Sequence, residues 1–191
     1  TVIKIERPGG DFARAYDGNV HGMSTHFVWT NRGKQSVVLD LKADADRATF
    51  DALIAGCDVF VHNVSPAAAR RLGIDPPALR AVHPSLIAVQ ISGYGEGGPR
   101  SEDKAYDLAV QAEAGAFSVT GSDEPSRIGF AAADISAGMY ALTSILAALV
   151  HRDRTGEGQR VEVPMVPTMQ AFLLVEHGAD VGLAFDGDAD R

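Results

Sequence analysis

The sequence predicts an α/β fold: a Rossmann-like, mostly parallel sheet with helices on both faces. Short β-branched runs alternate along the chain with alanine-rich stretches of helical periodicity, which is the rhythm of α/β domains. The apolar runs at 59–61 and 87–91 are nearly unbroken, as is typical of parallel strands that are covered on both faces. The 191 residues, 46% hydrophobic and 22% charged, suffice for one domain core.

Five strands and five helices are expected in alternation. The expected strands are Val2–Glu6, Ser36–Leu41, Asp58–Asn63, Leu86–Ser92 and Arg160–Pro164. The expected helices are Asp44–Ala55, Ala67–Leu72, Pro77–Val82, Ala105–Ala116 and Ile135–His151. The last helix is apolar almost all round, so we expect it to be buried on several sides.

Composition narrows the classes of partner and compartment. The net charge of −8 argues against a general nucleic-acid binder, although a few placed cations would suffice for an anionic small ligand. Cys57 is the only cysteine, which excludes an intrachain disulfide and favours a reducing, cytoplasmic location. We expect no membrane partner, because no apolar run approaches the roughly 20 residues that span a bilayer. The first six residues alternate like a strand and do not resemble a signal peptide.

A glycine-rich segment follows the fourth expected strand. The residues Gly93-Tyr-Gly-Glu-Gly-Gly98 formally fit the G-x-G-x-x-G pattern of dinucleotide sites. Such a site needs a helix directly after the loop, and the polar turn Pro99-Arg-Ser-Glu-Asp103 stands there instead. The segment is therefore interpreted as a flexible loop beside a ligand cleft, since loops at the carboxyl ends of strands line such clefts.

Asp134 lies among small residues just before the longest apolar segment, and two interpretations stand side by side. It can be a carboxylate at a helix start that interacts with free N–H groups and the helix dipole. It can also be a catalytic carboxylate, because its small neighbours would let a substrate approach closely. An aspartate is ionised at neutral pH and can act as nucleophile or base.

Other charged residues offer weaker indications. Arg7, Arg71 and Lys104 stand near expected strand ends or in loops, as ordinary surface charges or as binders of the phosphates of an anionic cofactor. His21 and His26 lack Cys or carboxylate partners at ligand spacing, which argues against a metal site.

The last residues contain three carboxylates at alternate positions. Asp186, Asp188 and Asp190 could point at one hard cation such as Mg²⁺ if the backbone loops around it. The alternative is a frayed acidic tail. The pattern is not an EF-hand, because Arg191 replaces the glycine that an EF-hand requires.

Several segments resemble the family III CoA-transferases, in order over about residues 1–177. They are Val2-Ile-Lys-Ile-Glu-Arg-Pro-Gly-Gly10, Asn31-Arg-Gly-Lys-Gln-Ser-Val-Val-Leu-Asp-Leu-Lys42, Asp58-Val-Phe-Val-His-Asn63, Ile91-Ser-Gly-Tyr-Gly95, Lys104-Ala-Tyr-Asp107, Ala133-Asp134 and Arg154-Thr-Gly-Glu-Gly-Gln159. The resemblance implies an interlocked homodimer, a large domain with a Rossmann-like sheet, and CoA or acyl-CoA as substrate. It also implies that residues 1–177 form only part of that large domain, under half of a usual subunit.

Site residues follow from the resemblance position by position. Asp134 matches the catalytic aspartate of the family, and the positions that line the CoA site are matched by Arg7, Asn63, Arg71 and Lys104. Tyr106 falls beside the active centre, where the racemases of this family carry a proton-shuttling histidine. With a reference pKa near ~10, a tyrosine is a poor replacement for that histidine, which favours a transferase over a racemase.

The segment 178–191 resembles a different family, through the Mg²⁺ loop of phosphohexomutases such as phosphomannomutase. It is interpreted as a tail that is not an independent domain, left by a splice, a fusion or mis-assembly. The phosphoserine and sugar-binding segments of a mutase have no counterpart in the sequence. We therefore expect no mutase activity, at most weak Mg²⁺ binding, and a fold that survives removal of residues 178–191.

Three hypotheses for the function come from this reasoning. The first is acyl-CoA:carboxylate CoA transfer through an aspartyl-CoA thioester on Asp134, with an acyl-CoA and a carboxylic acid as partners. The second is a CoA-binding or dimerising fragment without turnover. The third is racemisation of a 2-methylacyl-CoA with another base in place of the missing histidine.

Overall fold

The computed structural model describes residues 1–176, which divide into two compact units, one formed by Thr1–Gly56 and one that begins at Cys57. Each unit is described by itself.

The first unit contains a two-stranded parallel sheet. Its elements are β1 (Val2–Glu6), a 3₁₀ helix η1 (Phe12–Ala15), α1 (Thr25–Asn31), β2 (Lys34–Val38) and α2 (Asp44–Ala55). The strands pair in register from Val2 opposite Lys34 to Glu6 opposite Val38. The side chains of Asp11 and Ser24 cap η1 and α1 by accepting the free N–H groups of the first turns. β1 and α2 match the expected bounds, whereas β2 begins two residues earlier and ends three residues earlier than expected.

The second unit contains a three-stranded parallel sheet in the order β3-β4-β5. Its elements are β3 (Val59–His62), α3 (Pro66–Leu72), α4 (Pro76–Val82), β4 (Ile87–Ser92), α5 (Asp107–Glu113), α6 (Ala116–Val119), α7 (Ala132–Thr155), β5 (Arg160–Pro164) and α8 (Met165–Glu176). The central strand β4 pairs Val89 with Val61 on one side and with Val161 on the other.

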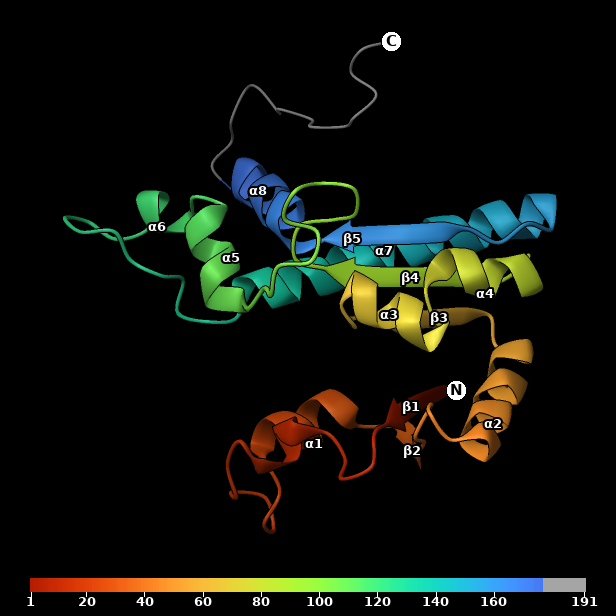
Figure 1. The fold of residues 1–191 in the computed structure, drawn as a ribbon. Helices are drawn as coiled ribbons and strands as arrows, with labels where there is room; N and C mark the ends of the chain where they lie inside the picture. Colours follow the sequence, from red (N-terminus) through yellow and green to blue (C-terminus); the bar gives the residue numbers. More distant parts are fainter. Residues whose placement is uncertain (177–191) are drawn as a thin grey trace. The chain divides into compact units, whose positions relative to one another are not determined.

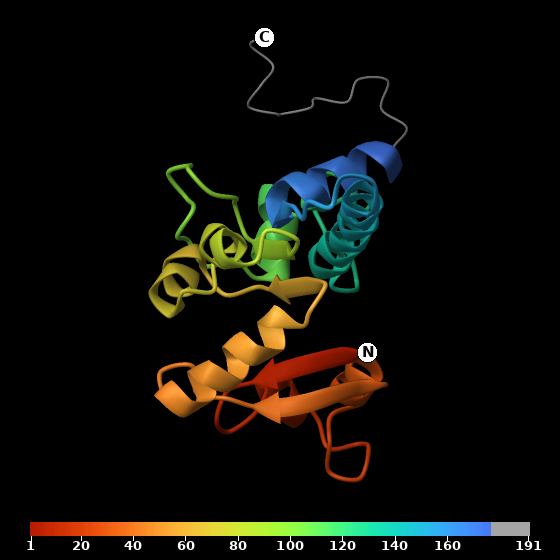
Figure 2. The same cartoon turned by 90° about the vertical axis from the view of Figure 1, so that its right-hand side faces the viewer.

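Helices cover both faces of this sheet, so the predicted α/β fold is confirmed. α3 and α4 lie on one face and α7 lies on the other (Figures 1 and 2). Alternation along β4 supplies both faces, because Ile87 and Val89 point to the α7 side. Ala88 and Gln90 therefore point to the opposite side, and all four residues are buried.

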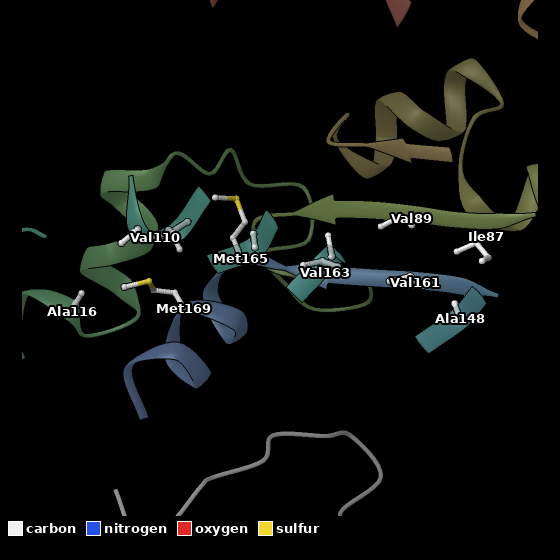
Figure 3. Packing of buried hydrophobic residues seen from close by; sticks show 13 residues of the cluster. Ile87, Val89, Val110, Ala116, Ala148, Val161, Val163, Met165 and Met169 are labelled. Atoms are coloured by element: carbon white, nitrogen blue, oxygen red, sulfur yellow. The ribbon is translucent and has the colours of Figure 1, made fainter. Parts of the chain in front are cut away.

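The core of the second unit lies between the sheet and α7 and continues past the ends of the strands to α5 and α8. The strands contribute branched side chains and α7 contributes alanines, which let the helix approach the sheet closely (Figure 3). The core consists of Ile87, Val89, Val110, Ala116, Ala132, Ala133, Ala137, Ala141, Ala148, Val161, Val163, Met165 and Met169.

Two expectations about the helices are wrong. The helix expected over 105–116 ends already at Glu113, and a separate short helix, α6, follows, because Gly115 adopts a positive φ of 88° between them. Within residues 1–176, α7 is buried on one side and not on several. Its alanine face is buried, and the opposite face exposes large apolar side chains, namely Ile135, Met139, Leu142, Leu146 and Val150.

The expectation that no apolar segment is long enough to span a bilayer is wrong for α7. By length and composition it is apolar enough to cross a membrane. Core helices of α/β domains pass the same test, and the alanine face of α7 packs on β4 and β5. This contact makes α7 one layer of the domain.

Candidate active site

The carboxyl ends of the three parallel strands define one edge of the sheet of the second unit. Asn63 directly follows β3, and Gly93 directly follows β4. α7 runs antiparallel to these strands, because Arg152 near its end donates to the carbonyl oxygens of Asp58 and Ser85, just before β3 and β4 (3.3 and 3.5 Å). Asp134, eighteen residues earlier on the helix and about 27 Å away along its axis, therefore lies toward the carboxyl edge.

Gly93 brings the segment before α5 against the end of β4. A Cβ added at Gly93 would lie 2.3 Å from the Cβ of Ala105, so only glycine allows this approach. Lys104 and Tyr106 flank Ala105 and are thereby held at the same edge. As expected, no helix follows the glycine-rich loop directly, since α5 begins only at Asp107.

The glycine-rich loop is fixed by a cluster around Arg100. The Arg100 guanidinium stacks on the Tyr94 ring, 4.0 Å from its centroid, and pairs with Glu113 of α5. Tyr94 donates its hydroxyl to Glu113 (2.8 Å). The hydrogen bond from Arg100 holds the pKa of Glu113 below its usual value, while burial and then the Glu113 contact raise the pKa of Tyr94. The loop is thus tied to Glu113, the last residue of α5.

The start of α3 also contacts the loop region. Glu102 accepts hydrogen bonds from the backbone N–H of Ala67 (3.1 Å) and from the Arg70 guanidinium (2.5 Å). Asn63 stands four residues before Ala67, and its neighbour Val64 donates to Nδ1 of the buried His62 (3.2 Å). Burial lowers the pKa of His62, which favours the neutral ring that can accept this hydrogen bond.

Asp134 is exposed in the first turn of α7, directly after the buried Ala132 and Ala133. The residue at the start of this helix is Ala131, whose side chain forms no cap. Asp107, the first residue of α5, serves instead. Its Oδ1 accepts from the N–H of Ala133 (2.8 Å) and more weakly from that of Asp134 (3.4 Å).

Gln111 links the same carboxylate to the segment that leads into α7. This fully buried side chain donates Nε2 to Asp107 (2.7 Å) and to the carbonyl of Phe130 (3.0 Å). Its Oε1 accepts the N–H of Ile128 (2.9 Å). Sequence reasoning missed Asp107 and Gln111 as contributors to the site, because an aspartate at a first helical position is an ordinary pattern and its partners are 26 residues away.

The residues expected to bind CoA are distributed over the two units. Asn63, Arg71, Lys104 and Tyr106 belong to the second unit and are exposed, and Tyr106 exposes 72% of its surface. Lys104 and Arg71 form no ion pair with any other residue of the described part. Arg7 belongs to the first unit, where its Nε donates to the carbonyl of Gly10 (3.4 Å).

The expected Mg²⁺ ligands Asp186, Asp188 and Asp190 lie outside the described residues. Among residues 1–176, no group of three or more His, Cys, Asp or Glu side chains is placed to hold a metal ion.

Comparison with known proteins identifies the family. The profile of CoA-transferase family III matches residues 1–186. The chain belongs to this family. The resemblance seen in the sequence is thereby confirmed, and the match extends nine residues beyond residue 177.

Named relatives agree with this assignment. The chain is 39% identical over 176 residues to acetyl-CoA:oxalate CoA-transferase of Acetobacter aceti, an alignment that covers 90% of this chain and 45% of the relative. It is 37% identical over 183 residues to succinate–glutarate CoA-transferase of Agrobacterium fabrum, covering 90% of this chain and 46% of the relative. The chain thus spans less than half the length of these relatives.

A solved structure shares the fold. The crystal structure of a CAIB/BAIF family protein from Brucella suis superposes with a TM-score of 0.84 at 33% identity, covering 94% of this chain and 51% of that one.

Proposed function

We propose that this family III CoA-transferase chain carries the nucleophile of an acyl-CoA:carboxylate CoA transfer, and that the nucleophile is Asp134. The observation that carries the proposal is an exposed aspartate in the first turn of α7, at the carboxyl edge of a parallel sheet, in a chain whose relatives transfer CoA between acids. Ligands of open α/β sheets bind outside the carboxyl ends of the strands. The buried Ala132 and Ala133 before Asp134 add no bulk that would hinder an acyl group.

The reaction has four balanced steps. The Asp134 carboxylate attacks the carbonyl of the donor thioester, the C–S bond breaks, and a mixed anhydride and CoA thiolate form. The thiolate attacks the aspartyl carbonyl, which releases the donor acid as its carboxylate and leaves an aspartyl-CoA thioester. The acceptor carboxylate attacks that thioester, giving a second anhydride and CoA thiolate. Attack of the thiolate on the acceptor carbonyl yields the new acyl-CoA and restores Asp134, with no net proton transfer.

CoA binding is assigned to Asn63, Arg71, Lys104 and Tyr106 of the second unit and to Arg7 of the first. Exposed cations suit the phosphates of CoA, and a tyrosine side chain next to the reacting centre offers both an apolar ring and a hydroxyl. Water must be kept from the anhydride, and oxyanion donors are required at the reacting carbonyl. We assign that role to backbone N–H groups of the glycine-rich loop other than those of Gly95 and Glu96, which donate to Ser92 and Glu162.

Trapping tests the nucleophile directly. The full-length protein is incubated with an acyl-CoA and hydroxylamine, and the modified peptide is mapped by mass spectrometry. We expect a hydroxamate on Asp134, loss of that adduct and of transfer in Asp134→Ala, and no change in Asp153→Asn, an exposed aspartate near the other end of the same helix. A hydroxamate on another residue refutes the assignment.

Two alternative functions remain to be separated from transfer. A CoA-binding or dimerising fragment without turnover would bind CoA in calorimetry but show no transfer on the same sample. A racemase would exchange the α-hydrogen of a 2-methylacyl-CoA for deuterium. Tyr106 at the position of the racemase histidine favours transfer over this second alternative.

The remaining expectations also belong to this proposal. A homodimer and a cytoplasmic location fit the family resemblance and the single Cys57, and analytical ultracentrifugation of the full-length protein tests the first. Mg²⁺ binding at Asp186, Asp188 and Asp190 is expected to be weak at most. Calorimetry with MgCl₂ on the Asp186→Asn, Asp188→Asn, Asp190→Asn triple variant and the parent checks this expectation.

A further inference from the structure

The start of α7 is held from outside the helix. Ordinarily the residue before the first turn accepts a free N–H group with its own side chain, and Ala131 forms no such bond here. The Asp107 carboxylate does so across 26 residues of sequence, with Oδ1 at 2.8 Å from the N of Ala133. The helix turn that carries Asp134 is therefore oriented by a charged group on α5.

The same carboxylate is itself held rigidly. Gln111, one turn further along α5, donates to Oδ2 of Asp107 at 2.7 Å and is fully buried. Because Gln111 also binds Ile128 and Phe130, it ties the segment entering α7 to the same place on α5. Hydrogen bonds that an ionised carboxylate accepts from N–H groups are stronger than those between neutral groups, so the arrangement resists displacement.

Asp107 also connects two parts of the proposed site. It directly follows Tyr106 and stands three residues after Lys104, both assigned to CoA binding. Its other contacts are the amides of Ala133 and Asp134. A shift of Asp107 would therefore change the distance between the bound thioester and the nucleophile.

We infer that Asp107 is a positioning residue for CoA transfer: by accepting the N–H groups of Ala133 and Asp134 it fixes the Asp134 backbone relative to the CoA-binding segment. This inference rests on the proposed function of Asp134. It has a second consequence, because an N–H group that is bound to Asp107 is not available to an oxyanion. The donors for the reacting carbonyl must then lie elsewhere.

The test compares three variants of the full-length protein. Asp107→Ala removes the acceptor, and Asp107→Asn keeps a neutral Oδ1 for Ala133 but loses the charge and the Gln111 bond. Asp17→Asn is the matched control, because Asp17 likewise accepts the first N–H group of a helix from outside, that of Thr25 at the start of α1 (3.0 Å). For each variant we measure kcat, the KM for acyl-CoA, thermal melting and the site of hydroxylamine trapping.

The expected result is a loss in kcat with little change in KM. A displacement of the nucleophile by about 1 Å costs about 100-fold in rate, which we expect for Asp107→Ala. The kcat of Asp107→Asn should be about tenfold higher than that of Asp107→Ala, because the amide oxygen still accepts a hydrogen bond from Ala133. It should stay about tenfold below that of the parent, because this bond is neutral and not charge-assisted. Asp17→Asn should keep the kcat of the parent.

Each other outcome has a defined meaning. An unchanged kcat in Asp107→Ala, or a loss that resides in KM alone, overturns the inference. If Asp107→Ala does not fold, Asp107→Asn decides: a lowered kcat at parental KM supports the inference, and a parental kcat overturns it. A trapped adduct elsewhere than Asp134 in the unmodified protein refutes the proposed function instead, so the two failures are distinguishable.

Discussion

The two units of the chain are stabilised by different means. In the first unit, Glu6 exposes only 5% of its surface and accepts four hydrogen bonds, two from the Arg14 guanidinium, one from Ser36 and one from the N–H of Asp11. Phe27 packs beneath the cations of Lys4 and Arg14. In the second unit the buried cluster is aliphatic, apart from the two methionine sulfurs.

The difference follows from what each unit can enclose. A unit of 56 residues with two strands buries few large apolar side chains, so a fully hydrogen-bonded carboxylate joins its helix, loop and strand. The second unit sandwiches its sheet between helices and gains its stability from burial of apolar surface. We therefore expect the two units to respond differently to core mutations, to pH and to salt.

The largest effect is expected from Ile87→Ala in β4. Ile87 is completely buried between the sheet and α7, and truncation of such a residue costs about 3 kcal/mol in the free energy of unfolding. Hydrogen exchange should accelerate in β3, β4 and β5 more than in β1 and β2. Equal acceleration in both sheets would show that the two units unfold together, and would contradict the expectation that they respond differently to core mutations.

A smaller effect is expected from Glu6→Gln in β1. The neutral amide loses the charge-assisted bonds to Arg14 and places an N–H group against other donors, at a cost of about 2 kcal/mol. Here exchange should accelerate in β1 and β2 and stay unchanged in β4. Denaturant unfolding of the double variant Glu6→Gln, Gln35→Glu, which restores the net charge at an exposed position of the neighbouring strand, separates the loss of the buried bonds from the change in net charge.

Acid should destabilise the first unit selectively. The hydrogen bond from Arg14 is the main reason that the pKa of Glu6 lies at about 2, below the 4.5 of an unperturbed glutamate. Because the folded pKa is the lower one, the stabilisation is fully present above pH 4.5 and is lost as the pH falls toward 2. Exchange measured over this range should rise in β1 and β2 of the parent and much less in Glu6→Gln.

The smallest effect is expected from Arg47→Ala on α2. Arg47 pairs with Asp51 one helical turn further along α2, on the exposed side of the helix. Loss of this ion pair lowers the free energy of unfolding by about 0.4 kcal/mol, and by less at high salt. Arg47 also lies 5.4 Å from the centroid of the buried Phe50 ring. A cost above about 1 kcal/mol that persists in 1 M salt would show that packing on Phe50, not charge, is the main contribution of Arg47.

The sequence alone determined the five strands and their order, the α/β class and the resemblance to the family. β1, β5 and α2 occupy their expected bounds because alternation and helical periodicity are local properties that neighbouring residues impose. The elements α1, α6, α8 and η1 were not expected. They are short or follow a strand without a break, and α8 begins at the residue after β5.

Only the tertiary structure decided how the candidate site is held. The approach of Ala105 to Gly93, the one-sided burial of α7 and the bond from Ala133 to Asp107 join residues that are far apart in the sequence. No periodicity signals such contacts, because they depend on where the sheet and its helical layers bring separate segments together. For Asp134 the local residue pattern left a helix-start carboxylate and a nucleophile open, and only the family resemblance favoured the nucleophile. The fold assigns the N–H groups of Ala133 and Asp134 to Asp107, because the first residue of α5 lies against the first turn of α7.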